Sequence, residues 1–386
     1  MNHQKPIKPN TKQTPLLTTE GDQEANAREQ KFIKTMRPSR IILPVLIGIF
    51  VVVYLFWAQF DLEKFREIRW TAAAFGWITL AFILLIFRHL FYTLRLHAIT
   101  GGAFSFVKCI QLMVLWEFSA ALTPTNKGGP AVMLFVLTKE KLSAGRTVAA
   151  VFYAMLADTG FFSIMLPVML LIYGPSMLYP GVTSFQASGF AGGTFLVTYS
   201  MMATYFVTLV FFMFIRPRYA GQLLQWLSKR SLLKRWSEKI AHTGRDFLLA
   251  AEETRRQPAR VHIAAVTGTI GAWFCKFAMI NCLMIAVVPS IPFDGTTQAF
   301  IYARLVAMFI IMAFSPTPGG AGFAEVALSN FISDYVPIGI GLVVALLWRG
   351  MAYYGYLIVG ALVVPGWISK KLIAPSPSAN YPTPNV

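Results

Sequence analysis

The sequence predicts an all-α membrane protein that crosses the bilayer several times. The chain is 56% hydrophobic and 13% charged, whereas soluble domains carry about a quarter charged residues. Residues 41–58 and 193–215 contain no charged side chain over 18 and 23 residues, and a spanning helix needs about 20 mostly apolar residues. Lys and Arg gather in the N-terminal tail, the short connections and one long loop, the pattern of cytoplasmic segments in membrane proteins.

The charge and composition of the remaining segments define the domain organisation. The polar residues 1–40 precede an apolar run that starts too late for a signal peptide, so we expect a disordered, basic cytoplasmic tail. A transmembrane domain covers 41–370 with a cytoplasmic loop at 216–260, and 371–386 form a second disordered cytoplasmic tail. The net charge of +17 lies in these segments, which argues against a nucleic-acid partner.

Six apolar segments are predicted to be full spans, and two others to be re-entrant hairpins. Lys108 and Lys139 flank the first hairpin and both have cytoplasmic surroundings, so the segment between them enters and leaves on one side. The second hairpin lies between Lys-poor stretches and enters from the opposite side. Both termini are then cytoplasmic. The spans are 41–58, 71–87, 148–173, 194–215, 261–288 and 338–364, and the hairpins are 104–137 and 299–333.

The two hairpins share a short pattern. Ser119–Gly129 and Met312–Gly320 each contain a helix end, a hydroxyl residue, Pro-Thr and then Gly-Gly. Related segments that enter from opposite faces indicate an inverted repeat. Chance similarity of two Pro-Gly turns is the alternative, and the sequence leaves both interpretations open.

The breaks at Pro124 and Pro316 are the first candidate site. Backbone groups freed by Pro and Gly inside a bilayer need protein or a water-filled cavity around them, and the amides at the start of a half-helix favour anions. Gly128, Gly129, Gly319 and Gly320 are expected to open the returning half-helices, with Lys127 in the first break. The alternative is that both breaks are ordinary external turns.

Ionisable residues in the apolar segments are the second candidate. A charge at the bilayer centre costs at least about 2.5–3.5 kcal/mol, so we expect Asp158, Glu325, Arg349 and Arg304 to form one internal network. These charged residues would either take part in the protein's activity or only hold the helices together as buried ion pairs. Lys276 and Arg304 could instead extend their charges to an interface.

The segment PTPGGAGFAE, with Asp158 upstream and LLWRGMAYY downstream, resembles the lysylphosphatidylglycerol synthase transmembrane-region family, also described as flippase-like membrane proteins. The resemblance covers about 40–370 and implies roles for Pro316 to Gly320, Glu325, Arg349 and Asp158. The first motif departs from the family pattern, because Pro130-Ala131-Val132-Met133 replaces a charged residue after the glycines. In two-part members a membrane half moves an aminoacylated lipid and a soluble half makes it; this chain leaves no room for that soluble half.

The leading hypothesis is a flippase-like protein of the bacterial inner membrane that binds and translocates an anionic or lipid-linked head group. A membrane-embedded enzyme, with Asp158 or Glu325 as general base, and a scaffold for a partner enzyme are the alternatives. We expect no enzymatic activity and no cofactor or metal. The expected partners are membrane lipids and a separate lipid-modifying enzyme. The candidate substrate-binding residues are Lys127, Gly128, Gly129, Asp158, Arg304, Pro316, Gly319, Gly320, Glu325 and Arg349.

Overall fold

The computed structural model describes most of the predicted transmembrane domain. Every regular element in this part of the chain is a helix, which confirms the all-α class. Six of these helices are long and apolar enough to cross a membrane. The described residues are 66, 68, 70–123, 128–182, 190–219, 222, 226, 237–313, 315, 320 and 322–370.

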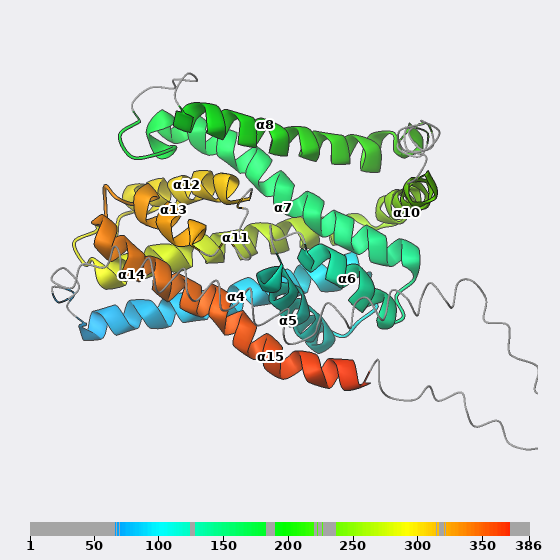
Figure 1. Cartoon of the computed structure of the whole chain (residues 1–386), viewed down its shortest axis with the longest axis horizontal. Coiled ribbons are helices and arrows are strands. Elements are labelled where there is room, and N and C mark those ends of the chain that lie inside the picture. Colours follow the sequence, from blue (N-terminus) through cyan, green and yellow to red (C-terminus); the bar gives the residue numbers. More distant parts are fainter. Residues whose placement is uncertain are drawn as a thin grey trace, which may run out of the picture. The chain divides into compact units, whose positions relative to one another are not determined.

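Figure 1 shows the helices in order along the chain, coloured from the N-terminus to the C-terminus. Five of the six predicted full spans coincide with long helices, and the first, 41–58, lies outside the described residues. Residues 338–368 form two α-helices joined by a π-helical turn. The elements are α4 (Ala72–Ile99), α5 (Phe106–Leu122), α6 (Gly128–Lys139), α7 (Ala144–Tyr173), η1 (Pro175–Met177), α8 (Phe190–Val210), η2 (Phe211–Ile215), α10 (Ser237–Arg256), α11 (Ala259–Val287), α12 (Gly295–Met312), α13 (Phe323–Phe331), α14 (Ile338–Arg349), η4 (Gly350–Tyr354) and α15 (Gly355–Ile368).

Short polar side chains start several of the helices. Thr71 caps α4 by accepting a hydrogen bond from the Ala74 amide at 3.2 Å. Asp294 caps α12 in the same way, with the Thr297 amide 2.9 Å away. These side chains satisfy amides that have no partner inside the helix, so the boundaries follow from the local sequence.

The prediction that the second span ends near 87 was wrong. Helix α4 continues to Ile99 and carries Arg88 and Arg95 as buried residues. The two arginines face the protein interior rather than a cytoplasmic connection, because each has a carboxylate partner on another helix. Paired charges can remain at membrane depth where isolated ones cannot.

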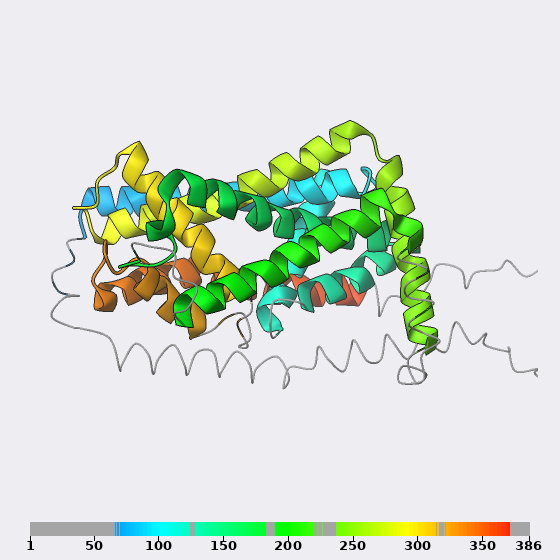
Figure 2. The ribbon, with the colours of Figure 1, turned by 90° about the horizontal axis from the view of Figure 1, so that it is seen from above.

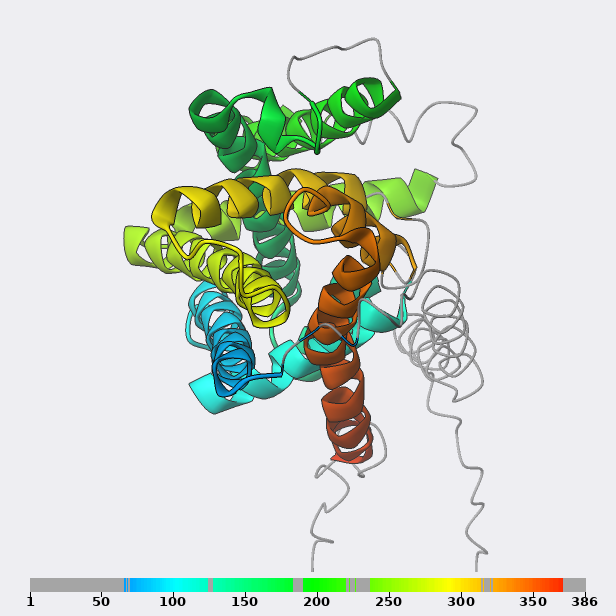
Figure 3. The same cartoon turned by 90° about the vertical axis from the view of Figure 1, so that its left-hand side faces the viewer.

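Helices α4 and α11 pack closely along their length, and α11 lies between α4 and α12 (Figure 1, Figure 3). Two glycines of α11 allow this approach. A Cβ atom on Gly268 would lie 2.8 Å from the Phe91 carbonyl oxygen, and one on Gly271 would lie 2.6 Å from the Phe91 ring. Small residues at a helix crossing are typical of membrane proteins.

The first predicted hairpin consists of α5 and α6, which pack against each other. Its two ends meet, because Lys108 at the start of α5 forms an ion pair with Glu140 just after α6, at 2.7 Å. Glu140 also accepts a hydrogen bond from the Trp367 indole on α15 at 2.7 Å. With 12 residues, α6 is about 18 Å long and too short to cross a hydrocarbon core of about 30 Å.

The second predicted hairpin consists of α12 and α13, and it differs from the expectation at its break. Gly320 does not open the returning helix, which begins at Phe323, and Gly319 lies outside the described residues. Gly320 and Gly322 have φ of +72° and +79°, a conformation that glycine adopts at little cost. The turn therefore continues past the glycines. Helix α13 has nine residues and cannot cross a bilayer. Re-entry and the inverted repeat stay predictions.

Helix α10 is the described part of the predicted cytoplasmic loop. It packs across the first turns of α7 (Figure 2), where Arg146 forms an ion pair with Glu253 at 3.0 Å. Its buried face includes Ala250, Ala251 and Thr254. This part of the loop is therefore held against the helical core.

Candidate functional site

A cavity of about 100 Å³ lies where several helices end or change direction. Its walls include the last turn of α5 from the first hairpin and the last turn of α12 from the second. Charged side chains from α4, α5, α11 and α14 face it. The lining residues are Arg88, Glu117, Ala120, Ala121, Lys276, Phe309, Met312, Trp348, Arg349, Ala352 and Tyr353. We call this space the charged cavity.

One side of the charged cavity is formed by an ion pair between α4 and α5. The Arg88 Nη2 atom lies 2.7 Å from Glu117 Oε1. Arg88 also donates to the Tyr356 hydroxyl on α15 at 3.3 Å. Its guanidinium lies 5.0 Å from the centroid of the Tyr92 ring. These contacts hold a buried cation in place at the wall of the cavity.

A second ion pair joins α14 to α13. Arg349 Nε lies 3.0 Å from Glu325 Oε1, and both side chains are buried. The π-helical turn η4 begins directly after Arg349, and such turns often occur at functional sites. Within it, the Tyr353 ring lies 3.8 Å from the Arg349 guanidinium carbon, and its hydroxyl donates to the Ala121 carbonyl at 3.2 Å. The turn thus connects Arg349 with the end of α5.

Lys276 of α11 supplies a third cation. Its ammonium lies 4.6 Å and 4.4 Å from the centroids of the Trp273 and Phe309 rings. Within the described residues no carboxylate or carbonyl oxygen accepts from it. Three cations face or border the cavity, and the two glutamates Glu117 and Glu325 balance two of them. One positive charge remains unmatched.

Further hydrogen-bond donors at the charged cavity lack acceptors. The Trp348 indole nitrogen and Arg88 Nε are buried and have no hydrogen-bond partner among the described residues. Buried polar groups are nearly always paired, and the missing partner of a donor is an acceptor. The cavity therefore combines excess donors with excess positive charge, the arrangement that suits an anionic group with several oxygen atoms.

Asp158 lies in a separate cluster beside this cavity. Its Oδ1 accepts from Arg95 at 2.6 Å and from the Trp273 indole at 3.0 Å. Arg95 also lies against the Tyr92 ring, 4.5 Å from its centroid. The Trp273 ring that contacts Asp158 also contacts Lys276. The two clusters thus share Tyr92 and Trp273.

Arg304 belongs to a third cluster. Its guanidinium pairs with Asp334, which follows α13, and donates to the Ser176 carbonyl in η1 at 2.7 Å. The expected single network of Asp158, Glu325, Arg349 and Arg304 was therefore wrong. Glu325 and Arg349 pair with each other, whereas Asp158 and Arg304 have other partners that the sequence order does not reveal.

The predicted Gly-rich residues are only partly described. Gly128 begins α6, as expected. Gly129 is buried, and a Cβ atom there would lie 2.9 Å from Ala120 Cβ, so it allows α5 and α6 to approach beside the charged cavity. Gly320 is buried at the second break. Lys127, Pro124, Pro316 and Gly319 lie outside the described residues.

Arg88, Glu117, Lys276 and Trp348 were missing from the predicted site. A signal for the arginines is present in the sequence. Arg88, Tyr92 and Arg95 follow a spacing of four and three residues, which places them on one helix face. Lys276 interrupts an apolar helix without such a companion, and its role depends on neighbours from other helices.

The fold and the cavity define a class, a polytopic helical membrane protein with a charged site inside its helix bundle. The chain belongs to the lysylphosphatidylglycerol synthase transmembrane-region family, whose model matches residues 41–360. This confirms the resemblance seen in the sequence. A UPF0104 membrane protein of Archaeoglobus fulgidus is 26% identical over 313 residues, which cover 77% of this chain and 89% of the relative. No solved structure matches the chain.

Proposed function

We propose that this protein is a flippase-like transporter that binds an anionic or lipid-linked head group in the charged cavity and moves it across the bilayer. One observation carries the proposal. Arg88, Lys276 and Arg349 line the same space, and only two of these cations have a carboxylate partner among the described residues. The buried Trp348 indole nitrogen in the same wall has no acceptor there. A phosphate-type oxyanion supplies the missing acceptors and the missing negative charge.

The arrangement of the helix ends supports transport rather than static binding. Helices α5 and α12 end at the cavity, and α14 passes into a π-helical turn there. Irregular backbone at membrane depth is typical of transporter sites. In this account Arg349, Arg88 and Lys276 attract the phosphate, Glu325 and Glu117 hold the arginines, and the lipid chains remain in the bilayer.

The same proposal covers location and partners. We propose that both termini face the cytoplasm, which the basic segments support, and that the protein lies in a bacterial inner membrane. A separate enzyme would modify the lipid that this chain moves. We propose no chemical turnover by the chain itself, because the charged cavity combines paired carboxylates with cations and not a nucleophile with a base.

Reconstitution in liposomes tests the proposal. The purified full chain is placed in vesicles with fluorescent phosphatidylglycerol in one set and phosphatidylcholine in another, and exchange between leaflets is followed by dithionite quenching. We expect exchange that is faster for the anionic lipid and is lost in Arg349→Ala. Arg146→Ala is the matched control, because that arginine is 51% exposed and does not line the cavity.

Equal rates in wild-type, Arg349→Ala and protein-free vesicles would overturn the proposal. Mass spectrometry of the same lipids after the assay distinguishes the alternative function. A chemically altered lipid would show that the chain is a membrane-embedded enzyme.

A further inference from the structure

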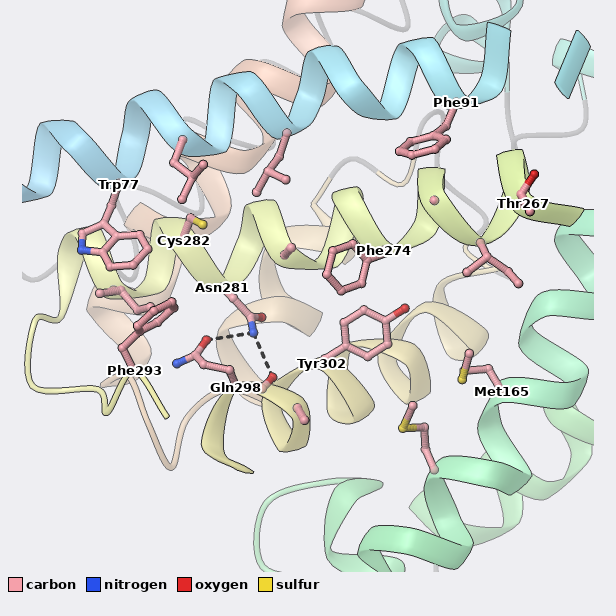
Figure 4. Close-up of a pocket in the computed structure, with 18 residues that line it drawn as sticks. Trp77, Phe91, Met165, Thr267, Phe274, Asn281, Cys282, Phe293, Gln298 and Tyr302 are labelled. Atoms are coloured by element: carbon pink, nitrogen blue, oxygen red, sulfur yellow. Dashed lines mark hydrogen bonds between the residues drawn. The ribbon is translucent and has the colours of Figure 1, made fainter. Parts of the chain in front are cut away.

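A second and larger cavity lies along α11, on the side away from the charged cavity. It is a groove of about 920 Å³ between α4, α7, α11 and α12 (Figure 4). We call it the apolar groove. We infer that it binds the hydrocarbon chain of a membrane phospholipid at a site distinct from the charged cavity. This inference does not rest on the proposed function.

The separation of the two sites follows from the helix geometry of α11. Phe274 and Ala278 line the apolar groove, and Lys276 lines the charged cavity. Lys276 is two residues from each of them, which corresponds to about 200° around the helix. Helix α11 therefore presents a lysine to one compartment and an apolar stripe to the other.

The length of the apolar groove fits hydrocarbon chains. Its lining on α11 runs from Thr267 to Ile285, which corresponds to about 27 Å of helix, close to the hydrocarbon thickness of about 30 Å. The small side chain of Ala278 adds little bulk to the floor of the groove, and Met165 and Met169 of α7 form an adaptable wall. The groove thus offers an apolar surface over most of the depth of a bilayer.

The groove is also accessible from the side. Phe274 of α11 is 55% exposed, and Phe293 in the connection between α11 and α12 is 71% exposed. Figure 4 shows these rings at the groove beside Tyr302 and Trp77. In a bilayer, lipid chains surround such a surface. The concave shape, with walls from four helices, distinguishes the groove from an ordinary lipid-facing helix.

A buried polar group beside one end of the groove connects two of its walls. Asn281 is 7% exposed, and its Nδ2 donates to the Gln298 carbonyl and Oε1, both at 3.0 Å. Its Oδ1 has no hydrogen-bond partner among the described residues. Asn281 therefore joins α11 to α12 beside the groove, and the surface that an occupant meets is apolar.

Photo-crosslinking tests the inference. The full chain is placed in nanodiscs with phosphatidylethanolamine that carries a diazirine in one acyl chain, irradiated, and mapped by peptide mass spectrometry. We expect label on groove residues of α11 and α12. Ala278→Trp and Ala299→Trp, which fill the groove from different helices, should each reduce this label at least fivefold. Ile263→Trp is the control, because Ile263 lies on α11, is 63% exposed and does not line the groove.

A second comparison tests whether the groove recognises the hydrocarbon chain alone. The same diazirine chain on phosphatidylcholine should label the wild-type groove as strongly as the phosphatidylethanolamine probe, because the groove surface is apolar. Lys276→Gln should leave the label unchanged, which separates this site from the charged cavity. Label spread evenly over exposed residues such as Val207 of α8, or crosslinks between two copies of the chain at the groove, would overturn the inference.

Discussion

Arg349 and Glu325 form a buried ion pair, with 3.0 Å between Nε and Oε1, that joins the end of α14 to the first turn of α13. The pair fixes the guanidinium at the charged cavity and connects the second hairpin to the last span. Buried pairs contribute little net stability but are costly to break. The main role of the pair is therefore to hold the Arg349 guanidinium at the charged cavity, rather than to stabilise the fold.

Breaking this pair should destabilise the protein. Glu325→Ala leaves Arg349 as an uncompensated buried charge, and we expect a loss of about 3–5 kcal/mol in unfolding free energy. The double variant Glu325→Leu with Arg349→Met removes both charges and should recover most of that loss while leaflet exchange remains absent. Unfolding in detergent, followed by circular dichroism, measures the stability of the single and double variants. The liposome assay measures their leaflet exchange. Equal stability of the single and double variants would argue against a buried pair.

Asp158 should act through Arg95 rather than through Arg349. In Asp158→Ala the buried Arg95 loses the carboxylate that lies 2.6 Å from it in the described part of the chain, so we expect lower stability and slower lipid exchange. Asp158→Asn keeps an acceptor for the Trp273 indole and should retain more of both. Asp334→Asn is the comparison variant, because Asp334 pairs with Arg304 in a different cluster. If Asp334→Asn lost as much lipid exchange as Asp158→Ala, the separation of these two charged clusters would be contradicted.

The crossing of α4 and α11 should depend on glycine in two different ways. An added Cβ at Gly271 meets the Phe91 ring, whereas one at Gly268 meets the Phe91 backbone oxygen. Gly271→Ala should therefore be rescued by Phe91→Leu, and Gly268→Ala should not. Overpacking costs about 1–3 kcal/mol, which thermal unfolding resolves. Rescue of both variants, or of neither, would contradict the proposed contacts.

The indole of Trp348 should matter for binding more than for folding. Trp348→Phe removes a buried donor that has no acceptor among the described residues. Loss of ring volume and relief of an unpaired N–H group oppose each other, so the change in unfolding free energy should stay within about 2 kcal/mol. Exchange of phosphatidylglycerol should slow about threefold or more. An unchanged exchange rate would remove the indole from the site.

Hydrophobicity was enough to predict most of the spans but not where α4 ends. Five of the predicted spans coincide with helices because each needs only a long apolar run. Arg88 and Arg95 resemble the end of a span in a hydropathy profile. They continue the helix because Glu117 and Asp158 lie opposite them, and these partners come from segments 29 and 63 residues away.

The candidate site was predictable only where a local motif marks it. Glu325 and Arg349 were identified from the pattern around the second break, and the structure brings them together. The importance of Lys276 was not visible, because an isolated lysine in an apolar helix has the same sequence signature whether it lines a cavity or reaches an interface. Arg304 was assigned to the wrong network because its partner Asp334 follows another helix, and this contact is not visible in the local sequence.

The most direct test of the central claim is the leaflet exchange of phosphatidylglycerol by Lys276→Gln. This change removes the cation that no carboxylate balances in the described part of the chain. With the protein folded and incorporated as well as Arg146→Gln, we expect exchange to fall at least about tenfold, equivalent to about 1.4 kcal/mol. Exchange by Lys276→Gln at the rate of Arg146→Gln would contradict the account of the charged cavity as an anion site.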